Sequence, residues 1–126
     1  MEYTFVIFAM CPLLLTSCGN RDEKLTKQII GTWTTTDSDV LTYAPNGRFD
    51  EKWTGTKNNT TKSLAFQGKW AVRDGELIST LTNSSSQGFT NIESAGHVDH
   101  FNIIAVDNTH LVLELGGETN VWKRIK

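Results

Sequence analysis

The feature that most constrains the fold is a series of tight turns between short segments of strand-forming residues. Asn46-Gly47, Asp74-Gly75 and Gly116-Gly117 are dipeptides that accept the positive φ angles of two-residue hairpin turns. Connections this short allow the flanking strands to pair only in the antiparallel sense. The turns therefore predict an antiparallel sheet whose strands follow one another in chain order.

The clearest strand lies at residues 63–72, where Leu64, Phe66, Trp70 and Val72 share one face and polar residues interrupt the other. Further strands are expected at residues 31–36, 40–43, 49–54, 77–82, 97–106, 110–115 and 119–125. Polar loops are expected at residues 55–62 and 83–90, and a short helical turn at residues 25–30.

A small chain with this many strands must close its sheet, as a barrel or a sandwich, or it exposes unpaired strand edges that favour aggregation. We predict an all-β fold, an antiparallel up-and-down β-barrel of about eight strands preceded by the short helical turn. The segments at residues 37–43 and 87–96 also fit loops, so the strand count stays open.

The N-terminal segment has the features of an export signal. Its apolar run at residues 6–15 is about ten residues long, against the roughly 20 that a spanning helix needs. Leu15-Thr16-Ser17-Cys18 follows, and it resembles the lipobox of bacterial lipoproteins, in which the cysteine is acylated after cleavage. The resemblance implies a signal peptide at residues 1–17, a lipidated tether at 18–24 and one domain at 25–126.

Acylation of Cys18 would make the lipid bilayer a partner of the protein and place it in the cell envelope. Gly19 follows the cysteine, which in such lipoproteins implies the outer membrane. The alternative is an ordinary cleaved signal peptide that leaves Cys18 free or disulfide-bonded.

Composition argues against several classes of function. The two cysteines are Cys11 and Cys18, so the domain has no thiol for a disulfide, a nucleophile or a thiolate metal site. A formal net charge of −2 gives no basis for binding nucleic acid. The sequence has no Gly-x-Ser-x-Gly motif, and we expect neither enzymatic activity nor a cofactor.

His97, Asp99 and His100 form the one sequence cluster of metal-ligand residue types. On a strand, His97 and Asp99 share a face while His100 points away. His110 would complete a zinc-type set only if its strand paired in the right register. The alternative is that these residues are polar groups on the wet face of a strand or at a barrel mouth, and we predict no metal site.

Gly31-Thr32-Trp33 resembles the Gly-x-Trp signature of lipocalins. A similar order of motifs occurs in small lipocalin-like domains of bacterial lipoproteins, and the resemblance spans roughly residues 28–126. It implies that Gly31, Trp33 and Arg124 form a structural signature, with Trp33 closing the barrel floor and Arg124 packing across it. The later motifs are Pro45-Asn46-Gly47-Arg48-Phe49, Gly68-Lys69-Trp70, Asp74-Gly75 and Val121-Trp122-Lys123-Arg124.

The chain is shorter than lipocalins and lacks their disulfides and C-terminal helix, so we expect a shallow or side-chain-filled cavity. Trp53, Phe66 and Trp70 are the candidates for lining an apolar ligand site, because they combine large apolar area with inward strand faces. Core packing is the alternative role for these aromatic residues.

We expect a membrane-anchored lipoprotein whose barrel binds a small apolar or amphipathic ligand in the cell envelope. The alternative is a non-catalytic protein-interaction or inhibitor lipoprotein without a ligand cavity, with contacts in the loops at residues 55–62 and 83–90. An empty interior of a few hundred cubic ångströms favours the first function, and a core filled by Trp and Phe favours the second.

Overall fold

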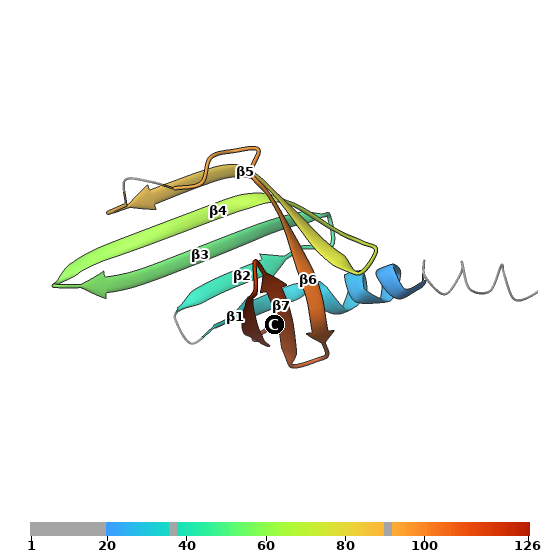
Figure 1. Cartoon of the computed structure of the whole chain (residues 1–126). Helices are drawn as coiled ribbons and strands as arrows, with labels where there is room; N and C mark the ends of the chain where they lie inside the picture. Colours follow the sequence, from blue (N-terminus) through green and yellow to red (C-terminus); the bar gives the residue numbers. More distant parts are fainter. Residues whose placement is uncertain (1–19, 36–37, 90–91) are drawn as a thin grey trace, which may run out of the picture.

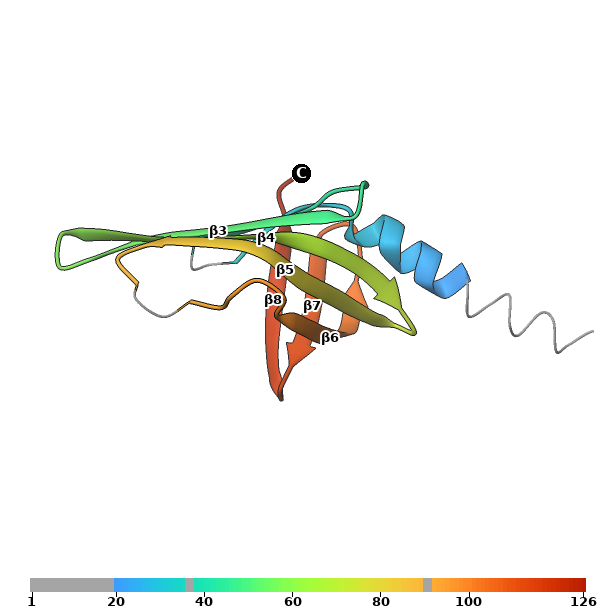
Figure 2. The same ribbon diagram turned by 90° about the horizontal axis from the view of Figure 1, so that it is seen from above.

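The computed structural model describes residues 20–35, 38–89 and 92–126, so the lipobox and Cys18 lie outside the described residues. Eight antiparallel strands close into a barrel in chain order, behind one helix at residues 20–29 (Figure 1; Figure 2). This confirms the predicted all-β up-and-down barrel and its short N-terminal helix. The strands are β1 (Gly31–Thr34), β2 (Asp39–Tyr43), β3 (Arg48–Lys57), β4 (Thr60–Arg73), β5 (Glu76–Gln87), β6 (Val98–Val106), β7 (His110–Leu115) and β8 (Glu118–Arg124).

Closure depends on a short ladder between the first and last strands. Trp33 on β1 pairs with Arg124 on β8, and Thr34 pairs with Lys123. The Thr32 N–H donates to the Lys126 carbonyl at 2.9 Å, which extends the ladder to the end of the chain. Where they pair, β1 and β8 have no exposed strand edge. Closing the sheet in this way is one means by which small β-proteins avoid edge-to-edge aggregation.

Asp74-Gly75 and Gly116-Gly117 form two-residue hairpin turns where the sequence predicts them. Asn46-Gly47 instead belongs to a longer β2–β3 connection, residues 44–47, in which Gly47 has a positive φ angle of 84° and Asn46 does not. Asp74 and Gly75 have φ angles of 53° and 77°, and Gly116 and Gly117 have φ angles of 59° and 84°. Two successive positive φ angles are the geometry of the type I′ turn, whose twist matches that of the strands it joins. Glycine avoids the steric cost that most side chains meet in this region.

The expectation of polar loops at residues 55–62 and 83–90 is wrong for most of both segments. β3 and β4 continue to a two-residue turn at Asn58 and Asn59, whose φ angles are 53° and 62°. β5 continues beside β4 as far as Gln87. Asparagine tolerates positive φ well, so Asn58-Asn59 acts as a hairpin turn, and the Ser and Thr residues around it pair as strand.

These additions form a three-stranded extension that projects past the barrel (Figure 1). We call it the β-extension. Its residues are 54–57 of β3, 60–65 of β4 and 82–87 of β5, beyond the last pairs that join β3 to β2 and β5 to β6.

The helix caps the barrel end that carries the β4–β5 turn, which we call the closed end (Figure 2). The Asp22 carboxylate accepts the N–H groups of Asp74 and Gly75 at 2.9 and 3.0 Å, and so fixes the helix to that turn. The helix includes residues 20–24 of the segment expected as a tether. Among the residues described, no helix has the length and apolar character needed to cross a membrane.

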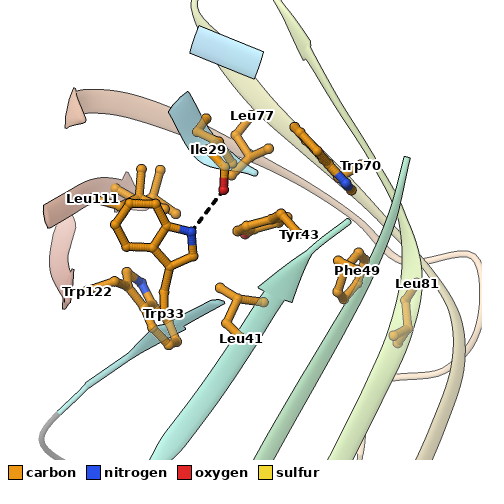
Figure 3. Close-up of a cluster of buried hydrophobic side chains, with 11 residues drawn as sticks. Ile29, Trp33, Leu41, Tyr43, Phe49, Trp70, Leu77, Leu81, Leu111 and Trp122 are labelled. Carbon is orange, nitrogen blue, oxygen red and sulfur yellow. Dashed lines mark hydrogen bonds between the residues drawn. The ribbon is translucent and has the colours of Figure 1, made fainter. Parts of the chain in front are cut away.

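The core fills the closed end of the barrel (Figure 3). Trp33 is fully buried, and its indole N–H donates to the Ile29 carbonyl at 2.9 Å. Tyr43 meets Trp70 edge-on with ring centroids 5.2 Å apart, a favourable arrangement for two aromatic rings. The buried apolar residues are Ile29, Trp33, Leu41, Tyr43, Phe49, Trp70, Leu77, Leu81, Leu111, Leu113 and Trp122.

Arg124 joins three parts of the chain at the closed end. Its guanidinium carbon lies 4.2 Å from the centroid of Trp33, and its N–H groups donate to three main-chain carbonyls. Two of these carbonyls, of Gln28 and Ile30, belong to the end of the helix and the residue after it, and the third, of Asn108, belongs to the β6–β7 turn. A planar fork of donors suits this arrangement better than the single ammonium of Lys.

Gly31 is required next to this site. Its φ angle is 147°, and a Cβ atom there would collide with the guanidinium of Arg124 and lie 2.7 Å from the Lys126 carbonyl oxygen. Because glycine has no side chain, the guanidinium of Arg124 can lie against the face of Trp33.

We predict that Arg124→Ala lowers the free energy of unfolding by about 2–3 kcal/mol. The substitution removes charge-assisted hydrogen bonds and a cation–π contact, and leaves carbonyls without a donor. Arg124→Lys should lower the free energy of unfolding by less, since lysine keeps the positive charge but lacks the planar set of N–H donors. Urea denaturation followed by tryptophan fluorescence measures the change.

The neighbouring exposed residue Lys123 provides the matched control, because Lys123→Ala should change stability by no more than about 0.5 kcal/mol. Equal stability of the Arg124→Ala and Lys123→Ala variants would contradict the role given to Arg124.

Candidate ligand-binding site

The half of the barrel opposite the helix is hollow. A cavity of about 280 Å³ opens there, between the inward faces of the strands, at what we call the open end. Its apolar wall is formed by inward-facing residues of the strands from β2 to β8. The wall residues are Leu41, Tyr43, Phe49, Phe66, Leu81, Phe101, Leu113 and Trp122.

The base of the cavity is formed by aromatic residues that pack against one another. Tyr43 packs against Phe49 with centroids 6.4 Å apart and against Trp70, whose indole N–H donates to the Ala44 carbonyl at 3.0 Å (Figure 3). Burial raises the pKa of Tyr43, and repulsion by Glu51 raises it further, so this phenol stays neutral.

The rim of the cavity is acidic. Asp39 at the start of β2, Glu51 on β3, Glu93 in the β5–β6 connection and Asp99 on β6 all line it, together with His97. The Nε2 atom of His97 lies 2.9 Å from an Asp99 carboxylate oxygen and 3.6 Å from one of Glu93. Among the described residues that line the cavity, none is Lys or Arg.

This concentration of carboxylates changes the ionisation of the rim. Burial raises the pKa of Glu51 to about 7, with further contributions from the charge of Asp39, a hydrogen bond to Asp39, and the charges of Glu93 and Asp99. The hydrogen bond and charge of Asp99, and then the charge of Glu93, raise the pKa of His97. At neutral pH Glu51 is therefore partly protonated, whereas an exposed glutamate would be ionised.

The connection between β5 and β6 holds Glu93 in place over the cavity. The hydroxyl of Ser84 donates to the Glu93 carbonyl at 2.8 Å, and that of Ser86 donates to the Phe89 carbonyl at 3.1 Å. Phe89 stacks edge-on against Trp53 with centroids 5.7 Å apart. The serines of β5 thus fasten this connection to the inner face of the β-extension.

The three residues expected to line a ligand site lie in three different environments. Phe66 lines the cavity. Trp70 lies beneath it in the core, and Trp53 lies half-buried at the base of the β-extension against Phe89, so neither is a wall residue. The structural trio Gly31, Trp33 and Arg124 gathers at the closed end.

Sequence reasoning missed the rim residues Asp39, Glu51 and Glu93 as site residues. Glu51 carries the one local signal, since it alternates in phase with Phe49 and so belongs to the inward face of its strand. Asp39 and Glu93 reach the rim only through strand pairing and the β5–β6 connection, which a linear pattern does not show.

The residues with metal-ligand character separate in the structure. His97 and Asp99 share a face. His110 lies at the closed end, where its Nδ1 atom is hydrogen-bonded to the Thr109 hydroxyl at 2.8 Å. Glu93 is the third member of the cluster, since one ligand atom from each of Glu93, His97 and Asp99 lies within 4.8 Å of the others. One imidazole and two carboxylates are groups that a divalent ion accepts.

Comparison with known proteins identifies the fold. The sequence matches no protein-family model and no curated protein. The structure resembles the crystal structure of a lipocalin-like protein from Bacteroides uniformis, with a TM-score of 0.57 over 78% of this chain and 99% of that one. The barrel is lipocalin-like. At 14% sequence identity the likeness is one of fold alone.

We predict that Glu51→Gln stabilises the protein at pH 8.5 by about 1–2 kcal/mol. The pKa of Glu51 rises from 4.5 in the unfolded chain to about 7, so the folded state binds more protons in this interval. Stability therefore falls as pH rises from 4.5 to 7 and stays lowered above it, a loss that partial exposure to solvent reduces.

Urea denaturation at pH 5 and pH 8.5 tests this prediction, and the advantage of Glu51→Gln should nearly vanish at pH 5. Glu114→Gln is the matched control, because Glu114 lies on β7 outside the cavity lining. An advantage of Glu51→Gln that is the same at both pH values would contradict the proposed ionisation.

Proposed function

We propose that this protein is a non-catalytic lipoprotein of the cell envelope whose barrel binds a small apolar or amphipathic molecule. The observation that carries the proposal is the division of the barrel interior into a filled half and a hollow half. Aromatic and aliphatic side chains close one end, while about 280 Å³ stays open at the other, behind a polar rim. Apolar walls with a few convergent polar groups are typical of small-molecule sites.

The size of the cavity limits the ligand. About 280 Å³ is just below the range of roughly 300–1,000 Å³ usual for ligand pockets. The site therefore suits a short alkyl chain or a single ring system, and the remainder of a larger ligand would extend past the rim.

The β-extension supports a second candidate function, in protein interaction. Beyond Thr80 and Leu81, β5 has no ladder with β6 among the described residues. The main-chain edge of residues 82–87 opposite β4 therefore has no strand partner in the part of the chain that the structure describes. Such an edge can accept a strand from another protein. We favour ligand binding, since the cavity combines enclosure, apolar area and polar groups at one place.

Leu113→Trp is expected to weaken binding of the neutral apolar dye N-phenyl-1-naphthylamine at least tenfold. Leu113 is a wall residue, and the larger side chain would occupy the cavity. Wild-type protein should enhance the dye's fluorescence saturably, with one site per barrel.

Val121→Trp is the control, because Val121 is about half exposed on the neighbouring strand and the added ring points to solvent. Circular dichroism of both variants confirms that they fold. If the wild-type protein shows no saturable dye binding, an apolar site in the cavity is contradicted and the β-extension becomes the leading candidate.

Membrane attachment is proposed to depend on Cys18, on the strength of the lipobox-like sequence Leu15-Thr16-Ser17-Cys18. Two or more acyl chains bind a bilayer stably, whereas one chain binds only marginally. Cys18→Ser should move the protein from the outer-membrane fraction to the soluble fraction of bacterial host cells.

Intact mass spectrometry provides the direct measurement. The native protein should begin at an acylated Cys18. A mature protein that begins at Cys18 without acyl chains would contradict the proposed anchor while leaving the export signal in place.

A further inference from the structure

We propose that the cavity selects a cationic amphiphile, a molecule with an amine or quaternary ammonium group attached to a short apolar body. This inference rests on the proposed ligand-binding function and specifies the chemical class of the ligand. The apolar body would lie against the wall residues, and the positive group would lie at the acidic rim.

The charge of the rim is local and is not a property of the whole chain. The sequence holds 14 acidic and 12 basic residues, which is close to balance. The cavity lining, by contrast, includes the carboxylates of Asp39, Glu51, Glu93 and Asp99 and no Lys or Arg among the described residues. Low-dielectric walls beside charges of one sign concentrate the field and attract ions of the opposite sign.

Two basic side chains of β3 and β4 are directed elsewhere. The Lys62 ammonium lies 5.3 Å from the centroid of Phe89, in contact with that ring. Lys52 lies 3.7 Å from the Asp50 carboxylate, and neither residue lines the cavity. His97 contacts two of the rim carboxylates, those of Asp99 and Glu93. The rim thus keeps a negative excess that a bound cation would offset.

Glu51 connects the rim with the apolar wall. Across the ladders it lies opposite Leu41 on β2 and Phe66 on β4, both of which are wall residues. A carboxylate in this position can contact the ammonium of a ligand whose apolar part reaches Phe49 and Tyr43 below. Asp39 approaches it from β2, Glu93 from the β5–β6 connection, and His97 and Asp99 from that connection and β6.

The same geometry couples binding to protons. A cation at the rim stabilises the ionised form of Glu51, whose pKa is about 7 in the free protein, so binding releases a proton near neutral pH. By linkage, the affinity for a permanently charged ammonium should rise between pH 6 and pH 8.

Three probes with the same alkyl chain test the charge preference: octyltrimethylammonium, 1-octanol and octanoate. Each displaces N-phenyl-1-naphthylamine from wild-type protein in low-salt buffer with EDTA, which prevents a divalent ion on Glu93, His97 and Asp99 from neutralising the rim. We expect the ammonium to bind at least tenfold more tightly than octanol, and octanoate more weakly than octanol.

Two variants connect the preference to the rim. Glu51→Gln should reduce the ratio of ammonium affinity to octanol affinity at least threefold, whereas Glu114→Gln should leave this ratio unchanged. Isothermal titration of wild type with the ammonium in phosphate and in Tris buffer should reveal proton release near pH 7, which Glu51→Gln abolishes.

The outcomes separate this inference from the proposed function. Equal affinity for all three probes, or a preference for octanoate, overturns the charge selection while ligand binding stands. Failure of the dye and all three probes to bind overturns the proposed function itself.

Discussion

The stacking of Arg124 on Trp33 is the interaction on which the rest of the structure depends. The barrel closes where β8 meets β1, and the guanidinium lies at that junction, 4.2 Å from the indole centroid. Its donors also reach carbonyls at the end of the helix and in the β6–β7 turn. One planar cation therefore holds together segments almost a hundred residues apart in sequence, and the missing side chain of Gly31 gives it room.

That concentration of contacts at one end allows the other end to be hollow. Closely packed tryptophan, tyrosine and leucine side chains supply stability at the closed end, where little water can enter. The open end instead keeps four carboxylates near one another. Burial of Glu51, and then the charges of its acidic neighbours, raise its pKa, and this arrangement costs stability. Groups that oppose folding commonly persist where a binding site uses them, which accords with the function proposed for the cavity.

Local sequence patterns predict the fold well and the site poorly. Asp74-Gly75 and Gly116-Gly117 specify their hairpins through backbone conformation, and alternation around Trp70 specifies which face is inside. The polar residues around Asn58-Asn59 predict a loop, yet backbone pairing between β3 and β4 does not depend on apolar side chains. The rim escaped prediction because Asp39, Glu51 and Glu93 become neighbours only after strands far apart in sequence have paired.

The direction of the helix has a consequence for how the protein would exchange its ligand. Residues 20–29 extend from the closed end on the side away from the β-extension, for roughly 15 Å (Figure 1; Figure 2). If Cys18 carries the acyl chains proposed above, the anchor precedes the helix by two residues and so enters the fold at the closed end, opposite the cavity. A ligand would then arrive as a dissolved monomer from the aqueous side.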